Sequence, residues 1–133
     1  MRKKCKPIFI VLALISLLVI LLAVFFVQIN KRLESLLAWP MEDVNLVHVS
    51  DGIYQGRYHA FPIEAVVEVT MKDGKMIAID LIKHTNGQGE AAEAILGRVV
   101  ESQSLKVDAI AGATYSSKVI VLAIKDALAL PAE

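Results

Sequence analysis

The hydrophobic positions of this chain form one long uninterrupted block, followed by short periodic stretches. Residues 8–29 carry no charge, and Ser16 and Gln28 are the only polar side chains among them. At about 1.5 Å per residue, a helix of this length spans roughly 33 Å, which is enough to cross a bilayer. Four basic residues and no acidic residue precede the block. We therefore predict a transmembrane anchor at 8–29 with a basic cytoplasmic tail at 1–7.

A cleaved signal peptide is the alternative interpretation of this segment. Its apolar core would be about 7–15 residues long and would precede a small-residue cleavage site. The block here is longer, and residues 24–27 (Val-Phe-Phe-Val) offer no such site. We favour an uncleaved anchor whose helix continues to about Leu37, because Pro40 disfavours helix in the residue before it. Everything after residue 30 is then expected outside the cytoplasm.

The rest of the chain begins with strand-like alternation at 53–60, 64–72 and 76–83. In the second stretch, Val67, Val69 and Met71 face one way, and in the third we expect a shared face for Ile77, Ile79 and Leu81. The Asp73-Gly74 pair between them predicts a tight hairpin, because both central residues of a type I′ turn need positive φ. Three strands with one apolar face need a cover.

Helical spacing predicts that cover. Apolar residues recur at helical intervals in 88–103 and 116–130, and a short strand is expected at 105–110. The predicted fold class is α+β: a small antiparallel sheet covered by two helices and preceded by one transmembrane helix. We assign 30–50 to the end of the juxtamembrane helix and a linker, and 51–133 to the folded domain.

Charge and cysteine content exclude some classes of function. The net charge is zero, but the basic tail leaves ten Lys and Arg residues against 14 acidic residues in the remainder. No basic surface for nucleic acid is therefore expected. The single cysteine, Cys5, excludes a disulfide within one chain. The three histidines have no spacing typical of a metal site, so we predict no metal. No nucleophile, base and orienting group occur together, so no catalytic residues are predicted.

The most informative motif is at 108–117, Asp-Ala-Ile-Ala-Gly-Ala-Thr-Tyr-Ser-Ser. Gly112 can adopt positive φ at little cost, and small neighbours leave Thr114 unshielded. Thr114 stands near the start of a predicted helix, where backbone N–H groups attract anions. It is therefore placed to lie beside a phosphate or to carry one covalently. The alternative is that Thr114 is simply the N-cap of the helix.

This motif resembles the Asp-x-x-Ser/Thr-Gly-Ala-Thr-x-Thr/Ser-Ser motif of the FMN-binding domain family. That family includes the C subunit of the sodium-pumping quinone reductase and the G subunit of the Rnf complex. The resemblance implies that Thr114 carries FMN through a phosphoester bond installed by a flavin transferase, and that Asp108 belongs to the sequence this enzyme reads. Ala111 stands where the family usually has Ser or Thr. The other residues expected around the phosphate are Gly112, Ala113, Ser116 and Ser117.

A second stretch, 83–90, is a polar loop that alone would be taken as a solvated connection. It is similar to the His-x-Glu-Thr-Pro-Gly-x-Gly segment of the same family, although the glutamate is missing and Asn86 replaces the proline. The resemblance implies flavin contacts from His84, Thr85, Gly87 and Gly89. Asp51–Gly56 and Gln103-Ser104 also match, so the similarity covers about residues 50–130 in the family order.

These observations predict a membrane-anchored, extracytoplasmic electron-transfer flavodomain with FMN bound covalently to Thr114. We expect a single-pass protein in the cell membrane that exchanges electrons with redox proteins or a quinone and is not a stand-alone enzyme. The alternative is a membrane-tethered binding or sensory module with noncovalent flavin or none. A structural subunit of a membrane complex is the third possibility.

Overall fold

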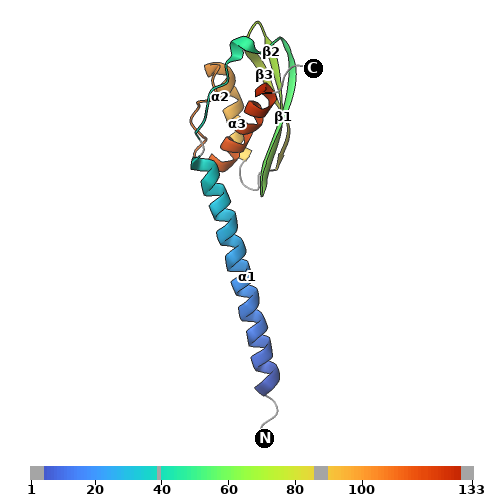
Figure 1. Cartoon of the computed structure of the whole chain (residues 1–133), viewed down its shortest axis with the longest axis vertical. Coiled ribbons are helices and arrows are strands. Elements are labelled where there is room, and N and C mark those ends of the chain that lie inside the picture. The colour runs from blue at the N-terminus through green and yellow to red at the C-terminus, as the bar shows by residue number, and fades with distance from the viewer. Residues whose placement is uncertain (1–4, 39, 86–89, 130–133) are drawn as a thin grey trace. The chain divides into compact units, whose positions relative to one another are not determined.

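The computed structural model describes residues 5–38, 40–85 and 90–129 of the chain (Figure 1). The chain divides into two compact units, Met1–Glu34 and Ser35–Glu133. The first consists mainly of helix α1 (Cys5–Ala38), whose last turn belongs to the second unit. Within the part of the chain that the structure describes, α1 is the one helix long and apolar enough to cross a membrane, with a mean hydropathy of 3.4 over its best window. The predicted helix end near Leu37 is confirmed.

The second unit contains a three-stranded antiparallel sheet in the order β1 (Gly52–Ala60), β2 (Ile63–Lys72) and β3 (Lys75–Thr85). The hairpin between β2 and β3 is as predicted. Asp73 and Gly74 have φ values of 50° and 70°, as a type I′ turn requires, and Lys72 pairs with Lys75 across it.

One face of the sheet forms the core. Val67, Val69 and Met71 are almost completely buried, as the alternation predicts. Ile79 and Leu81 lie opposite Val69 and Val67 and share their face. The prediction for Ile77 was wrong, because its side chain is 53% exposed. The pairing register shifts between Thr70 and Met71, so that the core position opposite Met71 is taken by Met76.

Two helices lie on this face of the sheet, as predicted (Figure 1). The first begins as a 3₁₀ turn, η2 (Glu90–Ala94), and continues as α2 (Ile95–Ser102), which contacts β3. The second, α3 (Thr114–Ala129), begins two residues earlier than expected and packs on β1 and β2. The α+β fold predicted from the sequence is therefore confirmed.

Helix α3 comes unusually close to the sheet at Gly56 in β1. A Cβ atom at this glycine would lie within 3.0 Å of the Ala123 carbonyl oxygen, the Ala127 backbone nitrogen and the Ala127 Cβ. A glycine inside a strand is typical of a bulge or of a close backbone approach, and the structure shows the close approach. Because the helix rests on the strand backbone here, α3 has a fixed depth on the sheet.

Gln103 fastens the end of α2 to the sheet. It adopts a left-handed conformation with φ of 52° just after the helix. Its Nε2 donates to the Met76 carbonyl at 2.8 Å, and its Oε1 accepts from the Met76 N–H at 2.9 Å. The amide therefore pairs with both backbone groups of a buried residue in β3.

The strand predicted at 105–110 is absent, since the structure has no strand in this segment. Side chains accept hydrogen bonds from several of its backbone N–H groups instead. The Leu105 N–H donates to Asp43 Oδ1 at 2.8 Å, and the Ile110 N–H donates to Ser117 Oγ at 3.0 Å. Because these bonds replace a sheet ladder, the segment crosses from α2 to α3 as an irregular connection.

Candidate functional site

The motif turn connects this irregular segment to α3. The Ala113 N–H donates to the Ile110 carbonyl at 2.9 Å, which closes the turn, and Gly112 has φ of 78°. No atom lies within 4 Å of the position that a Cβ on Gly112 would occupy. The positive φ is therefore the reason that glycine is favoured at this position. A side chain would meet no steric obstacle here, because the space around Gly112 is open.

Thr114 is exposed and is the first residue of α3. The Ser117 N–H donates to the Ala113 carbonyl at 2.9 Å, so this is the first bond of the helix and Ala113 occupies the N-cap position. The N-cap interpretation of Thr114 is thereby excluded. Alanine has no side-chain oxygen with which to cap the helix, and it is a poor N-cap residue for that reason. The N-cap residue therefore offers no side-chain acceptor to the first N–H groups of the helix, and the residue after it is the exposed Thr114.

Ser116 and Ser117 are both buried, unlike Thr114. The Ser117 hydroxyl accepts the Ile110 N–H at 3.0 Å, so its oxygen is used inside the turn. This places Ser117 as a brace between the residues before the turn and the first turn of the helix. Ala113, 6% exposed, is also packed inward.

Asp108 begins the motif and has an exposed side chain. Its backbone carbonyl accepts a hydrogen bond from Arg98 Nη1 in α2 at 3.2 Å. Sequence reasoning did not identify Arg98, because an exposed arginine on a short amphipathic helix has no pattern that distinguishes it from a solvated charge. The guanidinium fixes the start of the motif to α2.

The second predicted stretch begins at the end of β3. His84 lies opposite Ala65 in the sheet, its side chain is 2% exposed, and its Nδ1 lies 3.3 Å from Glu93 Oε1 in η2. Thr85 is exposed and ends the strand. The predicted contacts Gly87 and Gly89 lie outside the described residues. Glu93 was not identified from the sequence, because its nine-residue separation from His84 follows no helix or strand period.

Lys83, at the start of this stretch, turns to the other face of the sheet. Its Nζ donates to Glu64 Oε2 at 2.7 Å, and this bond lowers the pKa of the Glu64 carboxyl below its ordinary value. Lys83 is therefore part of a surface ion pair.

The two predicted stretches, 83–90 and 108–117, are connected through neighbouring elements. His84 in the first stretch lies beside Glu93 in η2, and η2 contacts α3, which begins inside the second stretch.

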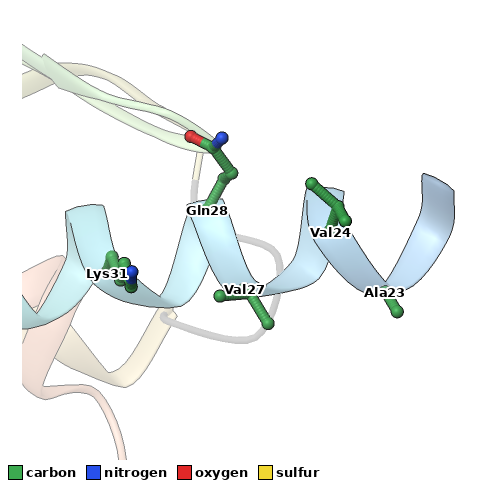
Figure 2. Close-up of a pocket in the computed structure, with 5 residues that line it drawn as sticks. All are labelled: Ala23, Val24, Val27, Gln28 and Lys31. Atoms are coloured by element: carbon green, nitrogen blue, oxygen red, sulfur yellow. The ribbon is translucent and has the colours of Figure 1, made fainter. Parts of the chain in front are cut away.

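Two surface hollows lie away from these residues in the sequence. Figure 2 shows the first, on α1, which is lined by Ala23, Val24, Val27, Gln28 and Lys31. The second, of about 230 Å³, lies between β1 and α3 and is lined by Tyr58, Leu122, Lys125, Asp126 and Ala129. Of the predicted flavin contacts that the structure describes, none lines either hollow. Among the described residues, no group of three His, Cys, Asp or Glu side chains is placed to hold a metal ion.

Comparison with known families gives one match that covers more than half of the chain. A family model described as an FMN-binding domain matches residues 59–129. The matched range includes most of the sheet, both helices that cover it, His84 and the whole motif turn with Thr114.

Proposed function

Because this chain belongs to the FMN-binding domain family, we propose that it is a membrane-anchored electron carrier whose FMN is esterified to Thr114. The proposed carrier exchanges electrons with a redox protein or a quinone at the membrane and does not turn over a substrate alone. Its domain lies outside the cytoplasm, as the basic flank of the anchor favours. A flavin transferase is the partner required for maturation.

The observation that carries this proposal is the uncapped start of α3. Thr114 is an exposed residue and the first of the helix, and Ala113 before it supplies no capping oxygen. Helix N-terminal N–H groups attract anions, and each contact contributes about 0.3–1 kcal/mol at an exposed site. A phosphate bonded to Thr114 Oγ would take the place of the missing cap. The residues present therefore fit a phosphoester at this position.

The attachment step uses the threonine hydroxyl as the nucleophile. Thr114 Oγ would attack the flavin-side phosphorus of FAD held by the transferase. A new P–O ester bond forms, the pyrophosphate bond breaks, AMP leaves, and the hydroxyl proton passes to a base or to water. In the chain itself, the positive φ of Gly112 and the brace from Ser117 present this hydroxyl at the surface.

A covalent bond also solves a problem of retention outside the cell. Noncovalent binding with a micromolar Kd corresponds to about −8 kcal/mol, and flavin released outside the cytoplasm is lost by dilution. A small domain also has a limited core in which to enclose a large cofactor. The bound flavin supplies the capacity to accept and donate electrons, while the chain holds it in place.

The test is to express the chain together with a flavin transferase and to examine the denatured band for flavin fluorescence. We expect fluorescence from the wild type and a mass increase equal to FMN less one water. Thr114→Ala should be dark, whereas the control Thr70→Ala, on the outer face of the sheet, should fluoresce. Fluorescence in Thr114→Ala would place the ester elsewhere. A dark wild type that releases free flavin on denaturation would favour the noncovalent binding module.

A further inference from the structure

The segment between the membrane helix and the sheet is bonded to the domain at several points. The second compact unit begins at Ser35, so the last turn of α1 belongs to it. Leu36 in this turn is 6% exposed. The next carbonyl, that of Leu37, accepts a hydrogen bond from Lys118 Nζ in α3 at 3.3 Å. Carbonyls in the last turn of a helix lack helical partners and favour a nearby cation, so Lys118 is well placed to stabilise this end.

The residues that follow are held by carboxylates. Asp43 accepts two hydrogen bonds of 2.8 Å, from the Ser104 hydroxyl and from the Leu105 N–H. Charge-assisted bonds of this kind are about twice as strong as neutral ones. Glu42 Oε2 lies 2.9 Å from Lys125 Nζ, and this bond lowers the pKa of the Glu42 carboxyl. That pair is exposed and contributes less.

The same segment is attached again at its far end, where the Tyr54 hydroxyl donates to the Ser50 carbonyl at 2.9 Å. Residues 35–50, which we call the strap, are thus fastened at four places to α3, to β1 and to the connection after α2. The sequence predicts the end of the juxtamembrane helix and a linker at 30–50, and the structure shows that residues of this segment are bonded to the domain.

The strap contacts flank the motif turn on both sides. Ser104 and Leu105 precede the motif, and Lys118 follows it one helical turn after Thr114, or about 6 Å along the helix axis. Figure 1 shows the last turn of α1 beside the beginning of α3. Thr114 is therefore at the same end of α3 as Leu37, near the start of the strap, whereas Glu42 contacts Lys125 farther along the helix.

We propose that the strap fixes the flavin-bearing end of the domain close to the membrane surface. This inference rests on the proposed attachment of FMN to Thr114. Leu37 is eight residues beyond Ile29, the end of the apolar block, which is about 12 Å of helix or at most roughly 28 Å of extended chain. If the strap were released, residues 30–50 would become a tether with a reach of about 70 Å. The strap thus shortens the segment that joins the apolar block to the domain from residues 30–50 to residues 30–37.

The test compares a strap variant with a variant of equal charge change. Glu42→Gln, Asp43→Ala and Lys118→Met together remove the hydrogen bonds of the strap to α3 and to the connection after α2, and Asp80→Ala, Glu101→Gln and Lys106→Met make the same change in charge at three exposed residues of the same domain. The full flavin-loaded chains are placed in phospholipid nanodiscs with rhodamine-labelled headgroups. Energy transfer from the flavin to the headgroups should fall at least twofold in the strap variant and stay at the wild-type value in the control.

A second readout needs no flavin. A nitroxide is attached at Val47→Cys in a Cys5→Ser background, because Val47 in the strap is 81% exposed and tolerates a label. We expect a slow, immobilised spectrum in the wild-type background and a faster one in the strap variant. Six Gly-Ser residues inserted between Glu34 and Ser35 serve as calibration: energy transfer should fall while the label at 47 stays immobilised.

These readouts separate the two proposals. Equal energy transfer and equal label mobility in the wild type and in a folded, flavin-loaded strap variant would overturn the strap proposal. If the strap variant unfolds, the chain with the Gly-Ser insertion between Glu34 and Ser35 decides. Energy transfer equal to that of the wild type in this chain would show that the flavin is not held near the headgroups, and would overturn the strap proposal. If no chain takes up flavin covalently, the proposed function fails, and the nitroxide spectra still decide whether the strap is fixed.

Discussion

Replacing Gly56 by alanine tests the packing that positions α3, the helix that begins with Thr114. The added Cβ would lie 2.7 Å from the Ala127 Cβ and closer still to two backbone atoms of α3. Backbone atoms cannot rotate away, so the whole helix must shift or the strand must bend. Overpacking of this kind costs about 1–3 kcal/mol, and a clash with backbone belongs at the upper end of that range.

The matched control is Gly97→Ala in α2. No atom lies within 4 Å of the Cβ position at Gly97, and alanine is favoured over glycine inside a helix by about 0.5–1 kcal/mol. The two substitutions are chemically identical, yet we expect opposite signs. For a domain of this size, each kcal/mol shifts Tm by about 4–8 °C. Gly56→Ala should therefore lower Tm by roughly 12 °C or more, whereas Gly97→Ala should raise it by a few degrees.

The assay is thermal unfolding of the full chain in detergent, followed by circular dichroism. A Gly56→Ala variant that unfolds within about 2 °C of the wild type would refute the argument, because it would show that α3 does not rest on the backbone of β1. The same holds if Gly56→Ala and Gly97→Ala change Tm equally.

Two further predictions concern Lys118 and the topology. Burial lowers the pKa of Lys118 below 10.5. Between the folded and unfolded pKa values, the unfolded chain therefore binds more protons than the folded chain. The free energy of unfolding should then rise as the pH increases through the folded pKa toward 10.5. In urea titrations between pH 7 and 10, this rise should disappear in Lys118→Met and persist in Lys106→Met; equal pH profiles for all three proteins would contradict it. Protease added to spheroplasts should digest the chain beyond residue 40, and protection of that region would reverse the proposed orientation.

The elements that the sequence predicted correctly are those that local pattern determines. The alternation of Val67, Val69 and Met71 with polar residues gave the core face of β2, and Asp73-Gly74 gave the hairpin. Ile77 was misassigned because a register shift is set by pairing between strands, which a single-strand pattern does not contain. The strand expected at 105–110 failed for a related reason: its N–H partner, Asp43, lies 62 residues away in the sequence.

The candidate site shows the same division. Thr114 and the positive φ of Gly112 follow from the motif itself, and both are where the sequence placed them. The position of Ala113 at the N-cap could not be predicted from the sequence, because a shift of one residue decides whether threonine or alanine caps the helix. The sequence did not predict the contacts made by Arg98, Glu93 and the strap. Each contact joins two different segments, and no helix or strand periodicity relates the positions of the two residues.

The alanine at the start of α3 implies a trade-off between fold stability and chemistry. A capping side chain at this position typically contributes about 1 kcal/mol to a helix, and this chain lacks it. A serine or aspartate here would tighten the fold and would also compete with any anion for the same N–H groups. Stabilised versions of this domain selected for heat resistance alone would therefore tend to acquire such a residue, and its side chain would compete with the phosphate that we propose on Thr114.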